Sequence, residues 1–369
     1  MFAPRADIHL GRLRSNFRAL TNHVGNAKVL AIVKADGYGH GLLPVSRALA
    51  EAGVHGFGVA LLQEALDLRA AGLSQMILHM GRFDRPTLDK YIQQDIRLTL
   101  HGSDDVLTLA AHHDSTGADY VVHLKVDTGM TRLGVPYAAA IEVLQEVKKL
   151  PFIRLEGIYS HFATADEEDL SYLRYQLARF TEFVHTVRKL SLDVKYFHVA
   201  NSAALAREPK AIFNMVRPGI LLYGVRPSEY VRPPFEVQPV MDLKAPLVMI
   251  KGVPRGTPVG YNRRFRAEED TTAGILQIGY ADGIQGSFSD TGLVELGHAV
   301  YPMIGGLSMD LCSIDLRGEE YPIGEEALLW GLSQDPRLRL EHQARLAGTI
   351  PYELMVRVGS RVERHYVED

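Results

Sequence analysis

A lysine at the end of a short apolar run is the residue of this chain with the clearest potential for chemistry. Lys34 follows the apolar run 29–33 and precedes a turn that contains three glycines. An apolar run bounded by glycines is typical of a strand that is buried on both faces. Partial desolvation favours the neutral amine of a lysine, which can form a Schiff base. The alternative is a lysine that only extends into solvent from the end of its strand. This segment alone does not distinguish a reactive lysine from a solvent-exposed one.

Further polar side chains lie within other strand-like runs or directly after them. They are Lys125, Asp127, Thr128, Arg132, His161, Thr164, His198, Asn201, Ser202 and Arg217. A structural role explains each of these residues, taken alone, more simply than a catalytic role does. Catalytic groups of a (β/α)8 barrel lie at the carboxyl ends of its strands. Their joint position at strand ends therefore indicates one shared site.

Strand-like and helical runs alternate through the first two thirds of the chain. The strand-like runs are 29–33, 56–61, 76–80, 96–100, 120–126, 155–160, 196–199 and 216–223. The helical runs are 42–51, 63–71, 86–94, 104–113, 137–150 and 169–189. This alternation predicts an α/β fold of the (β/α)8 TIM-barrel type. A doubly wound sheet is disfavoured because the glycines at 37, 39 and 41 lack the GxGxxG spacing of a dinucleotide turn.

The composition changes at 226–239, where four prolines and no helical pattern indicate a linker. Beyond it, short strand-like runs at 247–253, 274–278, 293–295, 299–304 and 311–315 are broken by Gly and Pro, and 341–346 is the one predicted helix. We therefore expect a barrel of residues 1–230 and a smaller, mostly β domain of residues 231–369. The first few residues of the chain could pair with that second domain.

Composition excludes several classes of function. A net charge of −4 over 369 residues gives no reason to expect nucleic acid or a membrane surface as a partner. The first residues lack the apolar core of a signal peptide, and the single cysteine, Cys312, cannot form an internal disulfide. We expect a cytoplasmic protein, and no metal site is predicted.

Motifs along almost the whole chain resemble those of the bacterial alanine racemases, which use pyridoxal 5′-phosphate. They are VKADGYGHG at 33–41, LKVDTGMTRLG at 124–134, HFATAD at 161–166, ANS at 200–202, VRPGI at 216–220, VGY at 259–261, IGYADG at 278–283, SMD at 308–310 and IPYE at 350–353. The resemblance implies that Lys34 holds the cofactor in a barrel-type fold. It also implies a homodimer whose subunits share each active site.

Racemisation needs one acid/base group on each face of the substrate Cα. The resemblance implies that Lys34 is the acid/base group on one face and that Tyr261, from the partner subunit, is the acid/base group on the other. A free phenol titrates at about pH 10, so Tyr261 needs cationic or hydrogen-bonding neighbours. The family pattern supplies His161 and Arg217. A tyrosine in a glycine-rich loop at the rim is the structural alternative.

The family assigns Arg217 to the pyridine nitrogen of the cofactor. A guanidinium there disfavours protonation of the ring, which favours proton exchange over transamination. The resemblance also implies contacts to the cofactor from Tyr38, His161, Asn201, Ser202, Gly219, Ile220 and Tyr352. It implies that Arg132 and the backbone of Met309 bind the substrate carboxylate. Asp166 and Tyr280 are implied to line the entrance of the site. Lys125 matches a lysine that is carbamylated in many members, with a salt bridge to Asp127 or another carboxylate as the alternative.

The chain departs from the family pattern in two places. Ile284, Gln285 and Gly286 replace an aromatic residue, Pro and Arg, and Gly306 replaces an arginine of the entrance. Both changes remove bulk or charge, so we expect weaker discrimination against larger side chains. The leading hypothesis is an alanine racemase that supplies D-alanine for peptidoglycan. The alternatives are a racemase of broader specificity, acting on serine or larger side chains, and a non-catalytic pyridoxal-phosphate carrier of the same barrel type.

Overall fold

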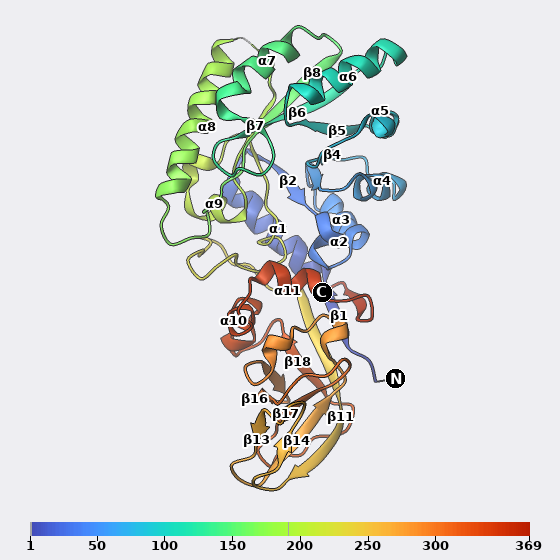
Figure 1. Cartoon of the computed structure of the whole chain (residues 1–369), viewed down its shortest axis with the longest axis vertical. Coiled ribbons are helices and arrows are strands. Elements are labelled where there is room, and N and C mark those ends of the chain that lie inside the picture. Colours follow the sequence, from blue (N-terminus) through green and yellow to red (C-terminus); the bar gives the residue numbers. More distant parts are fainter. Residues whose placement is uncertain (1, 191) are drawn as a thin grey trace.

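The computed structural model describes residues 2–190 and 192–369, which form two parts joined near the C-terminus (Figure 1). One part is built around a parallel sheet and the other around a mostly antiparallel sheet. Helix α11 (Pro351–Arg357) lies at their junction. The predicted barrel followed by a mostly β domain is confirmed.

The parallel sheet follows the order β10-β2-β3-β4-β5-β6-β8-β9, and a parallel bridge between Asn201 and Arg217 joins its two ends. Its strands are β2 (Lys28–Ile32), β3 (Gly56–Val59), β4 (Met76–His79), β5 (Ile96–Leu100), β6 (Tyr120–Asp127), β8 (Ile153–Tyr159), β9 (Tyr196–His198) and β10 (Met215–Val216), and the short β7 (Val135–Pro136) pairs with β6. Every predicted strand of the barrel is present.

The last strand is much shorter than the predicted run 216–223. Pro218 has no N–H to donate to a ladder. The N–H groups of Gly219 and Leu221 both donate to the hydroxyl of Ser202 and not to a carbonyl of a neighbouring strand. The chain therefore leaves the sheet after Arg217 and lies against the start of the preceding helix, at Ser202.

The helices of the barrel bury one face each. Helix α8, for example, buries Leu173, Leu177, Phe180, Val184 and Val187, which have the spacing of one helical stripe. The helices are α1 (Leu10–Val24), α3 (Leu42–Glu51), α4 (Leu62–Ala70), α5 (Leu88–Gln93), α6 (Ser103–Thr116), α7 (Ala140–Lys148), α8 (Ser171–Lys189) and α9 (Ser202–Arg207), with 3-10 turns at Arg85–Thr87, Tyr137–Ala139 and Pro209–Ala211. Helices α1 and α9 were not predicted.

The antiparallel part follows the order β14-β17-β16-β15-β18-β11-β1-β19. Its strands are β1 (Arg5–His9), β11 (Met241–Val253), β14 (Thr271–Leu276), β15 (Leu293–Leu296), β16 (Ala299–Ile304), β17 (Cys312–Asp315), β18 (Glu326–Trp330) and β19 (Glu363–Val367), and β12 (Pro258–Val259) pairs with β13 (Phe265–Arg266). Strand β1, at the start of the chain, lies between β11 and β19.

The prediction of one helix in the second part is wrong. Helix α10 (Leu340–Leu346) corresponds to it, but α11 is a second helix, and it begins at Pro351. A proline at the first helical position is a start signal for a helix. Three 3-10 turns complete this part, at Tyr280–Asp282, Gly286–Phe288 and Pro336–Leu338.

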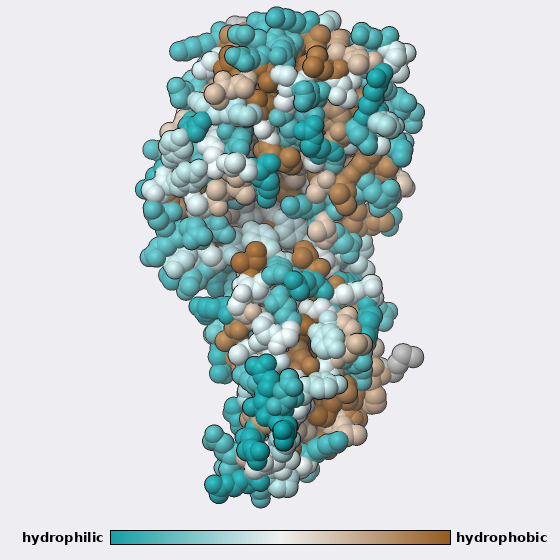
Figure 2. Space-filling model, viewed as in Figure 1, coloured by the Kyte–Doolittle hydropathy of each residue, from teal (hydrophilic) through white to brown (hydrophobic). Residues whose placement is uncertain are grey.

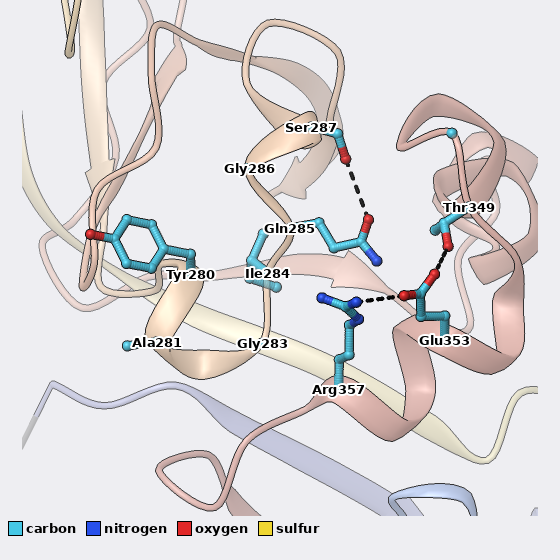
Figure 3. Close-up of a pocket in the computed structure, with 11 residues that line it drawn as sticks. Tyr280, Ala281, Gly283, Ile284, Gln285, Gly286, Ser287, Thr349, Glu353 and Arg357 are labelled. Atoms are coloured by element: carbon cyan, nitrogen blue, oxygen red, sulfur yellow. Dashed lines mark hydrogen bonds and ion pairs between the residues drawn. The ribbon is translucent and has the colours of Figure 1, made fainter.

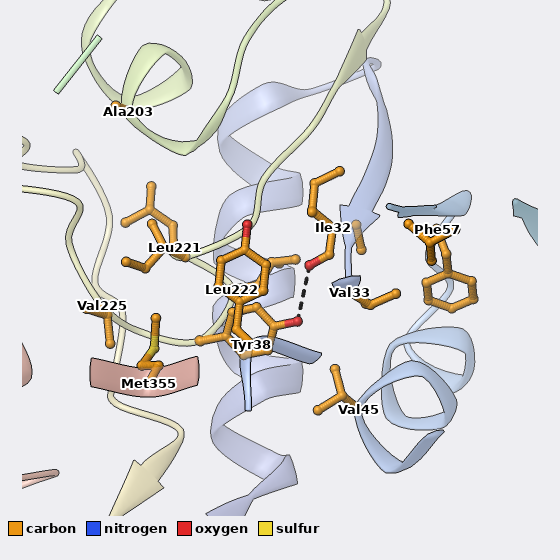
Figure 4. Close-up of a cluster of buried hydrophobic side chains, with 14 of the residues drawn as sticks. Ile32, Val33, Tyr38, Val45, Phe57, Ala203, Leu221, Leu222, Val225 and Met355 are labelled. Atoms are coloured by element: carbon orange, nitrogen blue, oxygen red, sulfur yellow. Dashed lines mark hydrogen bonds between the residues drawn. The ribbon is translucent and has the colours of Figure 1, made fainter. Parts of the chain in front are cut away.

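A hydrophobic cluster supports the end of β2 and reaches across to α11 (Figure 4). It includes Ile32, Tyr38, Leu221 and Met355, and the Tyr223 hydroxyl donates to the Ile32 carbonyl at 3.1 Å. Figure 2 shows the surface hollowed where the two parts meet. Among the described residues, no helix has the length and apolar character needed to cross a membrane.

Candidate active site

Lys34 lies at the start of a left-handed turn, α2 (Lys34–Tyr38), directly after β2. Ala35, Asp36, Gly37 and Tyr38 have φ angles of 53, 53, 58 and 56°. This conformation costs a non-glycine residue roughly 1–2 kcal/mol. The Asp36 carboxylate offsets part of the cost because it accepts the N–H of Leu42 at 2.7 Å. Backbone strain of this kind is concentrated at functional sites.

The mouth of the barrel concentrates positive charge around Lys34. Burial and the charge of Arg132 lower the pKa of Lys34. Burial, Arg132 and Arg217 lower the pKa of Lys125 to about 8. Burial and the same two arginines hold the pKa of His161 well below its usual value, so this imidazole is neutral at pH 7. Such a site favours anionic ligands and a neutral, nucleophilic lysine amine.

Asp127 shapes the loop that carries Arg132 and does not pair with Lys125. Its Oδ1 accepts the N–H groups of Gly129, Met130 and Thr131 at 2.9, 2.8 and 3.1 Å. Among the described residues, neither Arg132 nor Lys125 forms an ion pair within 4.0 Å. Both cations are therefore available to an anion at the mouth of the barrel.

Arg217 is buried and is held by several acceptors. One terminal nitrogen donates to the carbonyl of His198 at 2.7 Å and lies 3.0 Å from its Nδ1. The other donates to the carbonyl of Ser160 at 2.5 Å and lies 3.3 Å from Nδ1 of His161. Burial lowers the pKa of Arg217 to about 10, so the guanidinium stays charged at pH 7.

A line of buried polar groups extends from Arg217 through the barrel interior. Nε2 of His198 lies 2.9 Å from Nδ1 of His123, and Nε2 of His123 lies 3.6 Å from the carboxylate of Glu156. Since Arg217 can only donate, His198 accepts at Nδ1 and carries its proton on Nε2. The same reasoning places the His123 proton on Nε2, facing Glu156. His123 and Glu156 were missed, although a polar residue within each apolar strand run was a usable signal.

The segment after β10 forms a cradle beside α9. The Ser202 hydroxyl accepts the N–H of Gly219 at 2.9 Å, which leaves its own hydrogen free to donate. The buried N–H of Ile220 donates to no acceptor among the described residues. A Cβ at Gly219 would lie 2.4 Å from the Tyr38 hydroxyl, so only glycine leaves this cradle open. Unpaired amide and hydroxyl donors suit a phosphate group.

Two tyrosines and an asparagine complete this end of the site. The rings of Tyr38 and Tyr352 are 6.1 Å apart, so α11 of the β part reaches the barrel mouth. Burial raises the pKa of both phenols, which keeps them as donors. The charge of Asp166 also raises the pKa of Tyr352, so Asp166 lies nearby. The Asn201 side chain caps α9 by accepting the N–H of Ala204 at 2.9 Å.

Three further expected site residues lie on the β part. Tyr261, Tyr280 and Met309 are 68, 50 and 51% exposed. Tyr261 lies between β12 and β13, and β13 is remote from the barrel in Figure 1. One chain therefore does not bring Tyr261 to Lys34.

The two departures from the family pattern lie in different surroundings. Gln285 lines a polar cavity of about 560 Å³ beside α11, where Arg357 binds Glu353 at 2.5 Å (Figure 3). Gly306 pairs with Tyr261 in an antiparallel bridge. A Cβ at Gly306 would lie 3.2 Å from the Cβ of Tyr261, so this position directly adjoins the expected second base.

Comparisons with known proteins agree along the whole chain. The family model described as alanine racemase, N-terminal domain, matches residues 8–227, and the model of the C-terminal domain matches residues 240–366. The alanine racemase of Treponema pallidum subsp. pallidum is 39% identical over 379 residues, with 100% of each chain covered. That of Methanococcus maripaludis is 36% identical, with 98% of each chain covered.

Solved structures give the same result. The alanine racemase from D-cycloserine producing Streptomyces lavendulae superposes with a TM-score of 0.95 at 33% identity, covering 100% of this chain and 98% of that chain. The biosynthetic alanine racemase from Pseudomonas aeruginosa gives a TM-score of 0.89 at 31% identity, with 100% of both chains covered. The chain therefore belongs to the alanine racemase family of isomerases.

Proposed function

We propose that this chain is a pyridoxal-phosphate-dependent racemase that interconverts L-alanine and D-alanine. The observation that carries the proposal is Lys34, which has a lowered pKa and stands on a strained turn among Lys125, Arg132 and Arg217. That cluster of cations suits the phosphate and phenolate of the cofactor and the carboxylate of an amino acid. Pyridoxal phosphate, when bound, supplies the electron sink that acidifies the Cα proton of the amino acid.

The residues of the barrel mouth fit the cofactor from end to end. Ser202, Ile220 and Tyr38 offer the phosphate unpaired donors beside the open Gly219 position. Tyr352 borders the same region. At the other end, the charged guanidinium of Arg217 would face the pyridine nitrogen and keep it unprotonated. Asn201 acts indirectly, by capping the helix that presents Ser202.

Two acid/base groups serve the two faces of the substrate. The amine of Lys34 takes or returns the Cα proton on one face, and its lowered pKa suits this task. The hydroxyl of Tyr261 acts on the other face and comes from the partner subunit of a homodimer, with His161 and Arg217 as its neighbours in the assembled site. The exposure of Tyr261 and its distance from the barrel of its own chain support this arrangement.

The substrate carboxylate is held by two groups. Arg132, on the loop that Asp127 braces, binds one side, and the backbone N–H of Met309 from the partner binds the other. Lys125 has a pKa of about 8 and, among the described residues, no ion pair. The neutral fraction of its amine can add carbon dioxide, lose a proton to solvent and, as a carbamate, orient Arg132. In the assembled dimer, Asp166 and Tyr280 border the entrance.

The two parts of the chain have different roles in the proposed reaction. A barrel within residues 1–230 carries the cofactor and Arg132, and a β domain of residues 231–369, which also includes strand β1, supplies Tyr261 and Met309. The proposed reaction takes place in the cytoplasm and supplies D-alanine for peptidoglycan. A racemase of broader specificity is the second candidate, and Gly306 beside Tyr261 is the observation that favours it.

The experiment compares the wild type with Lys34→Ala and Lys125→Ala. The wild type and Lys125→Ala should bind pyridoxal phosphate as a yellow protein, and borohydride should fix the cofactor to the peptide containing Lys34. Lys34→Ala should lack the fixed adduct and should not convert L-alanine to D-alanine in a chiral assay. A borohydride adduct at another lysine would overturn the assignment of Lys34.

A further inference from the structure

Glu64 contacts the turn that carries Lys34 from the next βα unit of the barrel. It is the third residue of α4, and its Oε2 accepts the N–H groups of Ala60 and Leu61 at 2.9 and 3.0 Å. Its Oε1 accepts the N–H of Ala35 at 2.7 Å. One carboxylate therefore caps its own helix and also bonds the peptide that directly follows Lys34.

The Ala35 N–H has no other partner among the described residues. Within the left-handed turn, the N–H of Gly37 donates to the Val33 carbonyl at 2.8 Å, and the N–H of Gly39 donates to the Ala35 carbonyl at 3.0 Å. These bonds hold the later residues of the turn. The N–H of the first peptide, between Lys34 and Ala35, bonds Glu64, and this peptide directly adjoins the Lys34 side chain.

Glu64 also differs in charge from the groups around Lys34. Arg132, Lys125 and His161 face the Lys34 amine from other strands and loops. Burial and Arg132 lower the pKa of Lys34, whereas Glu64 raises it. Within the part of the chain that the structure describes, Glu64 is the one acidic side chain that shifts the pKa of this amine, and it offsets part of the repulsion from the cationic neighbours.

We propose that Glu64 is a positioning residue for Lys34: it fixes the strained turn through the Ala35 peptide and tunes the reactivity of the amine without touching cofactor or substrate. This inference rests on the proposed role of Lys34. It goes beyond that role because it assigns the geometry of the cofactor lysine to a carboxylate on a different βα unit.

The test uses Glu64→Gln, which keeps the length of the side chain but removes the charge and one acceptor. Glu64→Asp keeps the charge and the cap of α4 but is too short to keep both contacts. Asp67→Asn is the matched control, since Asp67 lies on the same helix and bonds Gln63 on the surface. Three readouts apply to each protein: deuterium exchange of the peptide spanning 34–41 in the apoprotein, the affinity for pyridoxal phosphate, and the pH profile of Lys34 acylation in the apoprotein.

Glu64→Gln should speed exchange at this peptide, weaken cofactor affinity on the order of tenfold and move the acylation profile to lower pH. Glu64→Asp should speed exchange with a smaller displacement of the profile, and it replaces Glu64→Gln if that variant does not fold. Asp67→Asn should match the wild type. If Glu64→Gln lowers thermal stability but leaves all three readouts unchanged, Glu64 is only a helix cap and the proposal is wrong. A wild type that binds no cofactor at Lys34 would instead refute the proposed function.

Discussion

Neutralising Glu156 should destabilise the barrel by an amount that depends on pH. Glu156 is 5% exposed, and its carboxylate lies 3.2 Å from Arg97 and 3.6 Å from Nε2 of His123. Burial disfavours its ionisation, but His123 and Arg97 outweigh burial and lower the pKa of Glu156 from 4.5 to about 2. Glu156→Gln keeps the shape of the side chain, removes the charge and replaces one acceptor oxygen by an amide donor.

The size of the effect follows from that pKa. The values of 4.5 and about 2 differ by about 2.5 pH units. Each unit corresponds to 1.36 kcal/mol, so the charged carboxylate contributes about 3 kcal/mol at neutral pH. Because the folded pKa is the lower one, this contribution is present above about pH 4.5 and is lost as the pH falls towards 2.

Urea unfolding followed by circular dichroism measures the difference at several pH values. At pH 7, Glu156→Gln should lower the free energy of unfolding by about 3 kcal/mol, and the gap should narrow as the pH falls below 4.5. Glu142→Gln is the control, because Glu142 lies in the first turn of the barrel helix α7, outside the buried face of that helix, and should have little effect. A loss below about 1 kcal/mol at pH 7, or a gap that does not change with pH, would refute the assigned electrostatic role.

Three further predictions concern the active site. Mixing inactive Lys34→Ala and Tyr261→Phe proteins should restore activity, because in a heterodimer both lesions fall in the same shared site and the other site keeps an intact Lys34 and an intact Tyr261. If exchange is verified and activity does not recover, each site is built within one chain. We expect the wild type to prefer alanine over serine by about 10–200-fold in kcat/KM. Gly306→Arg should increase this ratio, and Gly306→Ala should change it less. The same ratio in wild type and Gly306→Arg would exclude Gly306 from the substrate path. Ser202→Ala should weaken pyridoxal-phosphate binding about tenfold in equilibrium dialysis, and unchanged binding would count against the phosphate cradle.

The order of elements in the barrel could be predicted because buried parallel strands are continuous apolar runs between helices. Those signals are local. The predicted strand 216–223 failed because its end depends on Ser202, which is distant in sequence and takes the N–H groups of the segment. Helix α11 has a local start signal in Pro351, but it is only seven residues long and part of its stability comes from packing against the barrel mouth.

The candidate site was predicted unevenly for a similar reason. Lys34, Arg217 and Ser202 stand at strand or helix ends, where their joint position indicates one shared site. The left-handed turn after Lys34 could not be predicted, since Ala35 and Tyr38 rarely adopt positive φ and do so here under contacts from elsewhere. The role of Glu64 also depends on the fold, because the N–H of Ala35 that it accepts belongs to another βα unit. Glu156 is visible in the sequence as a polar residue in an apolar run, but its partners Arg97 and His123 lie on other strands.

The most direct test of the central claim follows the Cα proton. The purified protein, supplied with pyridoxal phosphate, is incubated with L-alanine in deuterium oxide. Early in the reaction the two enantiomers of alanine are separated, and the deuterium content of each is measured by mass spectrometry. Two bases on opposite faces predict D-alanine that carries deuterium and recovered L-alanine that still carries protium. D-alanine that retains the original proton would contradict the roles of Lys34 and Tyr261, and the absence of D-alanine would contradict the proposed reaction itself.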